Sequence, residues 1–228
     1  MEFTGFSPET FDFLWGIRMN NNREWFEAHK QDYLDHLYHP LKELGEELMA
    51  AMEEAYPDEG LQLKVTRIYR DVRRVKYGGL YKDHLWLVIR QPSEEWTARP
   101  AFYFEISPEG YEYGMGYYCA RPVQMEQYRR RIRREPEALE KLARKLNRQS
   151  TFHLEGDEYK RSKGECSELL KPWFNRKGID ICTFHAPDAR MTSPALVKDI
   201  LAGFDWLMPY YRYFKALELE PPVTDPIR

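Results

Sequence analysis

The sequence predicts an α+β fold, an antiparallel β-sheet with N-terminal and C-terminal helices packed on it, in a single domain over residues 1–228. Apolar residues follow helical spacing near both ends of the chain, and strand-like patterns gather between them. Runs of strands separated from runs of helices are typical of this class. The predicted order is helical in 7–56, mainly strands in 62–119, helical in 121–149, mixed in 150–190 and helical in 193–218.

Three helices are predicted before residue 56. Ser7 is suited to cap the first helix, because Pro8 fits the first helical position, where no N–H is needed. Asn21 is the expected cap of the second helix, with Glu24 three residues later in a capping-box pattern. Pro40 lacks an N–H, so we expect it to end the second helix and begin the third.

The strand region begins at about Leu63. Alternation favours a strand from Leu63 to Tyr69 followed by a loop, although Ile68, Val72 and Val75 also have helical spacing. The run "HLWLVIR" is nearly all apolar, which indicates a strand covered on both faces. "AFYFEI" and "YEYGMGYY" flank the turn "SPEG", so residues 101–118 are predicted to form a β-hairpin.

The second half of the chain returns to helices. Pro136 separates two predicted helices within 121–149, and "IDICTFHA" has the weak alternation of one more strand. Ser193 and Pro194 are suited to begin the last helix. Pro209 should kink or split that helix, because proline clashes with the preceding turn.

Composition limits the possible classes of protein. No apolar run approaches the roughly 18 residues that a membrane span needs, and "MEFTGFSPET" lacks signal-peptide features, so we expect a cytoplasmic protein. Cys119, Cys166 and Cys182 are far apart and odd in number, which argues against a disulfide framework or a cysteine zinc site and favours buried free thiols. The sequence leaves the oligomeric state open.

Positive charge is concentrated in the stretch "RIYRDVRRVKYGGLYKDH". Residues 64–90 contain eight Lys or Arg and two Asp, a formal charge of +6, so the rest of the chain carries −9 to give the total of −3. Arginine binds carboxylate and phosphate through a planar, permanently charged fork. The sequence therefore predicts a pocket for a small anion. The residues expected to form it are Arg67, Arg70, Arg73, Tyr81 and Lys82.

Other interpretations of this stretch stay open. Its arginines could instead be structural, paired with the acidic remainder of the chain. Asp71 is the weak candidate for an acid–base group if the protein is an enzyme on a phosphorylated or carboxylated small molecule, which the sequence leaves uncertain. "YRRRIRRE" adds five arginines at 128–135, which allows weak nucleic-acid binding, but a solvated helix face accounts for them better.

Metal and cofactor signatures are weak. His36 and His39 are three residues apart, with Asp32 four residues before His36, but no further ligand is placed by spacing. "GMGYYC" lacks the third glycine of a dinucleotide fingerprint, and no P-loop or G-x-S-x-G motif occurs. We therefore expect neither a metal nor a cofactor.

Four motifs occur in the order of a known family: "NNNREWFEAHKQDY", "RIYRDVR…YK", "AFYFEISPEG…GMGYY" and "SP…LAGF…LMP". Over Phe3 to Phe214 the chain resembles domain of unknown function 2461, a widespread bacterial family. The resemblance implies a single α+β domain and brings no established activity, cofactor or catalytic residue. After "RDVR" the family typically reads "FSKDKTPYK", whereas this chain has "RVKYGGLYK", so only Lys76, Tyr81 and Lys82 match there.

Overall fold

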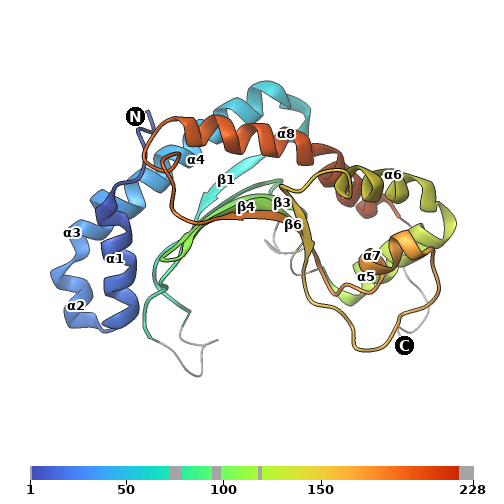
Figure 1. Cartoon of the computed structure of the whole chain (residues 1–228), viewed down its shortest axis with the longest axis horizontal. Coiled ribbons are helices and arrows are strands. Elements are labelled where there is room, and N and C mark those ends of the chain that lie inside the picture. The colour runs from blue at the N-terminus through green and yellow to red at the C-terminus, as the bar shows by residue number, and fades with distance from the viewer. Residues whose placement is uncertain (1, 72–78, 94–98, 118–119, 221–228) are drawn as a thin grey trace. The chain divides into compact units, whose positions relative to one another are not determined.

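The computed structural model describes residues 2–71, 79–93, 99–117 and 120–220 (Figure 1). Within them an antiparallel six-stranded sheet has the order β1-β2-β3-β4-β6-β5. Its strands are β1 Gln62–Val65, β2 Leu85–Arg90, β3 Ala101–Ser107, β4 Gly110–Tyr117, β5 His153–Glu155 and β6 Ile179–His185. The predicted α+β class and antiparallel sheet are confirmed.

Helices precede, interrupt and follow the strands, as predicted. They are α1 Pro8–Met19, α2 Arg23–Ala28, α3 Lys30–Asp32, α4 His39–Ala55, α5 Pro122–Arg134, α6 Pro136–Leu146, α7 Lys171–Phe174 and α8 Ala195–Lys215. A π-helical segment occupies Tyr33–Tyr38, and short 3₁₀ turns occupy Pro57–Glu59, Glu168–Leu170 and Ala216–Leu219.

The chain divides into two compact units. The first comprises Met1–Ile89, Tyr103–Tyr113 and Phe184–Gly203, and the second comprises Arg90–Phe102, Gly114–Thr183 and Phe204–Arg228. Strands β3, β4 and β6 and helix α8 contribute residues to both. That the chain is a single domain stays a prediction.

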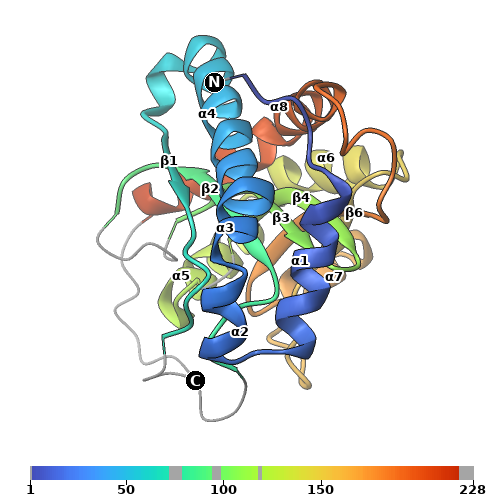
Figure 2. The same cartoon turned by 90° about the vertical axis from the view of Figure 1, so that its left-hand side faces the viewer.

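In the first unit, α4 packs along β1 (Figure 2). The contact is close, because a Cβ on Gly45 would lie 3.0 Å from Leu63 and 3.2 Å from Leu87. The preceding π-helical segment ends two residues before Pro40. We predicted a break between two helices at Pro40, because proline has no N–H to donate. The helical backbone instead continues from the wider π-helical turn directly into α4, which begins at His39.

The β3–β4 hairpin is confirmed, with its strands at Ala101–Ser107 and Gly110–Tyr117. Gly110 has φ +147°, and a Cβ there would lie 2.1 Å from the carbonyl oxygen of His185. Glycine is therefore required at the end of this turn, both for its conformation and for the close approach of β6.

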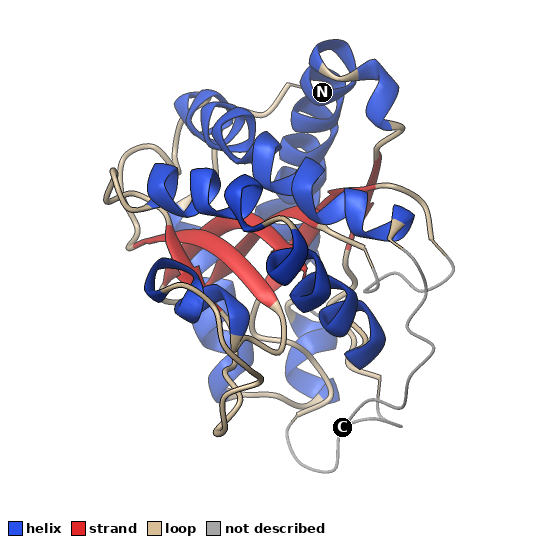
Figure 3. Ribbon diagram, turned by 90° about the vertical axis from the view of Figure 1, so that its right-hand side faces the viewer, coloured by secondary structure: helices blue, strands red, loops and turns tan. Residues whose placement is uncertain are grey.

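The second unit contains more helix than strand, because it includes α5, α6, α7 and residues 204–215 of α8. Figure 3 colours the helices of the chain blue and its strands red. The predicted break between α5 and α6 falls at Glu135, directly before Pro136. The core of the second unit is aromatic. Phe102 stacks with Tyr211 at 4.9 Å between ring centroids, and Trp206 stacks with Tyr210 at 5.2 Å. The expected split of the last helix is wrong, because α8 continues through Pro209 to Lys215. Among the described residues, no helix has the length and apolarity that crossing a membrane requires.

Candidate functional site

The predicted anion site lies on a two-stranded arm of the first unit. Tyr69 and Tyr81 form an antiparallel bridge, with the amide of Arg70 donating to Leu80 O at 3.0 Å and that of Lys82 to Ile68 O at 2.8 Å. We call residues 66–71 and 79–83 the basic arm. Arg73 lies outside the described residues, so its predicted role stays a prediction.

Asn21 lies in the turn between α1 and α2 and attaches the basic arm to it. Its amide nitrogen donates to Tyr81 O and its amide oxygen accepts from Tyr81 N, both at 2.9 Å. A Cβ on Gly79 would lie 1.9 Å from Cγ of Asn21, so the arm needs glycine there. The expected cap was wrong by one residue, since Asn22 accepts from Trp25 N at 2.9 Å.

Tyr81 anchors the arm through its side chain as well as its backbone. Its ring is 3% exposed and stacks on Phe26, with centroids 4.2 Å apart. Burial raises the pKa of the Tyr81 hydroxyl, and the neighbouring Tyr69 raises it further. The structure thus places Tyr81 as a support for the cationic side chains, with its ring packed inward.

The arm presents three described cations. Arg67 is exposed, and no carboxylate of the described residues lies within ion-pair distance of its guanidinium. Arg70 donates from Nε to Tyr81 O at 2.7 Å, and its Nη2 lies 3.5 Å from Asp83. Lys82 donates to the carbonyl of Arg67. Burial lowers the pKa of its ammonium group, and repulsion from Arg67 and Arg70 lowers it further.

Asp83 is a shared counter-charge at the base of the arm. It accepts from Arg18 Nε at 2.6 Å and lies 3.0 Å from Nδ1 of His84, in addition to its contact with Arg70. Burial opposes ionisation, but the hydrogen bonds from His84 and Arg18 bring the pKa of Asp83 below its ordinary value. Arg18 also binds Glu109 through both carboxylate oxygens. Asp71, the predicted acid–base candidate, is exposed at the end of the arm.

Polar side chains on β2, β3 and β4 continue from the arm. Lys82 Nζ lies 4.5 Å from the Trp86 ring, on which His84 also stacks. Burial raises the pKa of the half-buried Glu105 on β3, and Glu112 raises it further although His84 opposes this. Sequence reasoning missed these residues; for Glu105 the available signal was its alternation with buried Phe104 and Ile106 on β3.

A second polar cluster in the first unit surrounds Arg190. Its guanidinium binds Asp188 with Nε at 2.9 Å and Asp199 with Nη1 at 3.1 Å, and Nη2 lies 2.9 Å from Nδ1 of His185. Tyr113 donates to Asp199 at 3.2 Å. Burial lowers the pKa of His185, and Arg190 lowers it further. These groups satisfy one another, so the cluster fixes the loop after β6 rather than presenting free charge.

Two arginines of α5, in the second unit, are engaged with backbone carbonyls. Arg129 is 3% exposed and donates to Phe174 O at 3.0 Å and Arg176 O at 2.9 Å. Arg131 donates to Tyr213 O at 3.3 Å and lies 3.6 Å from Glu220. The expectation of a solvated helix face is therefore wrong for these two. Arg133 and Arg134 are exposed as expected, and they pair with Glu126, Glu135 and Glu220, which offset their charge.

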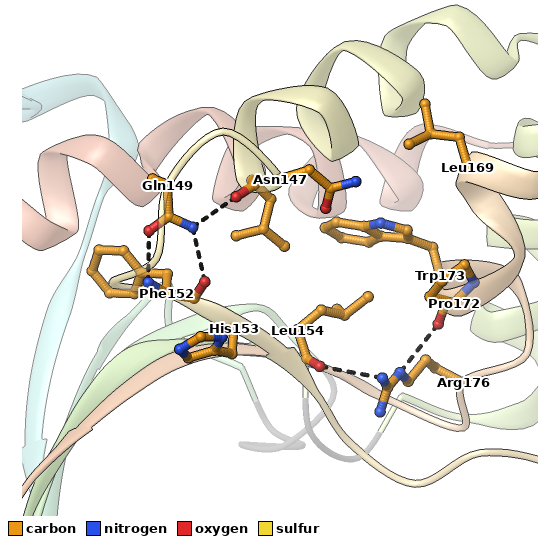
Figure 4. Close-up of a pocket in the computed structure, with 10 residues that line it drawn as sticks. Asn147, Gln149, Phe152, His153, Leu154, Leu169, Pro172, Trp173 and Arg176 are labelled. Atoms are coloured by element: carbon orange, nitrogen blue, oxygen red, sulfur yellow. Dashed lines mark hydrogen bonds between the residues drawn. The ribbon is translucent and has the colours of Figure 1, made fainter.

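A cavity of about 220 Å³ in the second unit has its glutamine and arginine side chains engaged with backbone carbonyls (Figure 4). Gln149 donates to Leu146 O and Phe152 O, both at 2.8 Å, and Arg176 donates to Pro172 O at 3.1 Å and Leu154 O at 3.2 Å. Both side chains thus support the surrounding backbone. Within the described part of the chain this cavity is a weaker candidate than the arm.

The weak metal alternative finds no support among the described residues, because Asp32, His36 and His39 do not bring their ligand atoms within 4.8 Å of one another. Of the cysteines, Cys182 is a buried free thiol as expected, Cys166 is free and half-buried, and Cys119 lies outside the described residues.

Comparison with known sequences identifies the family but not an activity. No curated protein matches the chain. A family described as "Conserved hypothetical protein (DUF2461)" matches residues 9–213, which include the basic arm, Asn21 and the Arg190 cluster. Because the match covers most of the chain, the resemblance that the four motifs suggested is confirmed, and the protein belongs to the DUF2461 family.

Proposed function

We propose that this protein is a cytoplasmic binding protein for a small carboxylate or phosphate, held at the basic arm. The observation that carries the proposal is Arg67, an exposed guanidinium with no carboxylate partner among the described residues. It lies on the same arm as Arg70 and Lys82, and repulsion from both arginines contributes to the lowered pKa of Lys82. Net repulsion among cations favours an added anion, which relieves it.

The chemistry of the arm fits an oxyanion with two or more oxygens. Arg67 can donate from its whole fork, because no described acceptor occupies it. Arg70 has its Nε committed to Tyr81 O and its Nη2 only 3.5 Å from Asp83, a weak contact that leaves donor capacity. A ligand bridging the two guanidiniums would make charge-assisted hydrogen bonds with both.

The competing interpretation is that the cations only stabilise the arm. The bonds from Arg70 to Tyr81 O and from Lys82 to Arg67 O favour it, because both join the two segments of the arm. Arg67 distinguishes the two interpretations, because its guanidinium makes no hydrogen bond or ion pair with another described residue. The proposal concerns binding; enzymatic turnover of the ligand is a separate question.

The test is thermal unfolding with millimolar sulfate, phosphate, succinate or a short RNA, at ionic strength matched with chloride. A ligand present at about 100 times its Kd adds roughly 2.7 kcal/mol to the stability of the folded state. We expect one anion class to raise the Tm of the wild type and to have at least a fivefold weaker apparent affinity for Arg67→Ala. Arg148→Ala is the matched control, because Arg148 is also exposed and has no described side-chain partner.

Three results would overturn the proposal. One is the absence of any anion-specific shift in the wild type. Another is an equal loss of affinity in Arg67→Ala and Arg148→Ala, which would indicate general charge attraction. A shift with RNA alone would favour the nucleic-acid alternative instead.

A further inference from the structure

The first unit also contains a cavity of about 330 Å³ beside α1 and α2, far in sequence from the basic arm. Its walls come from two short stretches of chain, one on α1 and one running from α2 into the π-helical segment. The lining residues are Glu9, Asp12, Phe13, Trp25, His29, Asp32 and His36. No Lys or Arg lines it, so its charge is opposite to that of the arm.

The apolar part of this cavity is aromatic and held in place. Phe13 is buried and lies 5.7 Å from Trp25, and His29 stacks on Trp25 with centroids 4.0 Å apart and planes at 13°. Trp25 also presses against Gly16, where a Cβ would lie 2.5 Å from the indole ring. The rings therefore form a fixed apolar surface on which a short carbon chain can pack.

The polar groups of the cavity offer mainly hydrogen-bond acceptors. Nδ1 of His29 lies 2.8 Å from the carbonyl oxygen of Trp25, so Nδ1 carries a proton and, when the ring is neutral, Nε2 is an acceptor. The carboxylates of Asp12 and Asp32 have no hydrogen-bond or ion-pair partner among the described residues. A ligand that suits this lining must be a donor with positive charge and an apolar portion.

A bound metal ion fits this geometry less well than an organic cation. Among the described residues, no three of the lining carboxylates and imidazoles bring ligand atoms within 4.8 Å of one another. Anions are disfavoured because three carboxylates line the cavity. The volume is within the range of small-molecule sites, which begins at roughly 300 Å³.

We propose that the cavity between α1 and α2 binds a small primary alkylammonium group. The ammonium donates to Asp12, Asp32 and Nε2 of His29, while its carbon chain packs on Phe13 and Trp25. This site is separate from the basic arm, and the proposal does not depend on anion binding there.

The experiment titrates the ¹⁵N-labelled full chain with n-butylammonium and follows the indole N–H signal of Trp25, assigned with Trp25→Phe. Two probes serve as ligand controls: 1-butanol has the carbon chain without the charge, and tetramethylammonium has the charge without N–H donors. We expect a saturable shift with n-butylammonium, at least fivefold weaker binding of tetramethylammonium, and no saturable shift with 1-butanol.

The variants locate the binding. Asp12→Asn combined with Asp32→Asn should weaken n-butylammonium binding at least tenfold. Asp35→Asn removes a carboxylate from the same stretch, but one outside the cavity, and should leave binding unchanged. Equal weakening by Asp35→Asn, a shift with 1-butanol equal to that with n-butylammonium, or a shift that does not saturate would each overturn the proposal. Thermal unfolding of each variant confirms that it is folded.

Discussion

The two arginine-rich segments of this chain use the same residue type in opposite ways. On α5, Arg129 and Arg131 direct their guanidiniums to backbone carbonyls, and Arg129 is almost fully buried. On the basic arm, Arg67 is exposed and has no described ion-pair partner. The difference is in the acceptors that the fold supplies. Where carbonyls and carboxylates surround an arginine it stabilises structure, and where they are missing its charge is available to a ligand.

The largest loss of stability is expected from Arg129→Met. The substitution leaves the carbonyl oxygens of Phe174 and Arg176 without these donors in a buried place. Each unsatisfied group costs about 1–3 kcal/mol, so we expect the free energy of unfolding to fall by about 3 kcal/mol. Urea unfolding measures the loss.

Arg144→Met is the control for this experiment. Arg144 is an exposed arginine on α6 that pairs with Glu140 in the i, i+4 arrangement. Its loss should cost no more than about 0.5 kcal/mol. Similar losses for the two variants would break the comparison, because the α5 arginine would then not be structural.

The next effect tests how the arm is attached. Asn21→Ala removes both hydrogen bonds to the Tyr81 backbone, each of which contributes about 1 kcal/mol, so a loss of about 2 kcal/mol is expected. Asn22→Ala removes only the cap of α2, at a cost of about 1 kcal/mol. Chemical unfolding of both variants measures which of them loses more unfolding free energy. A larger loss for Asn22→Ala than for Asn21→Ala would contradict the role assigned to Asn21.

Asn21 also shows what the sequence could and could not predict. Local patterns, such as "SPEG" in the hairpin turn and Pro136 between two helices, predicted their elements because the physical cause lies within a few residues. In "NNN" the spacing to Glu24 favoured Asn21 as the cap of α2, but Asn22 is the cap. The side chain of Asn21 is held by Tyr81, 60 residues later, and no local pattern indicates that contact. The bond from Tyr113 to Asp199 in the Arg190 cluster joins residues 86 apart, so periodicity carried no signal for it either.

A smaller effect on stability is expected at two carboxylates, Glu105, which has no arginine partner among the described residues, and Glu109, which is bound by Arg18. Burial raises the pKa of Glu105, so its ionisation destabilises the fold as the pH rises above the ordinary carboxyl pKa. Glu105→Gln should therefore be more stable than the wild type at pH 8 and equal to it near pH 4. Glu109 is the control with the opposite sign, because its hydrogen bond with Arg18 lowers its pKa. Glu109→Gln should be less stable than the wild type at pH 8. Thermal unfolding across this pH range checks both signs.

The smallest change in stability is expected on the arm itself, where the comparison is sharpest. Arg70→Ala removes the bond to Tyr81 O and should cost about 1 kcal/mol. Arg67→Ala removes no described side-chain contact and should change the free energy of unfolding by less than about 0.5 kcal/mol. It should nevertheless raise the pKa of Lys82, because Arg67 is one of the charges that lower it, and NMR titration of the lysine Nζ measures this. A large stability loss with an unchanged Lys82 pKa would make Arg67 a structural residue like those of α5.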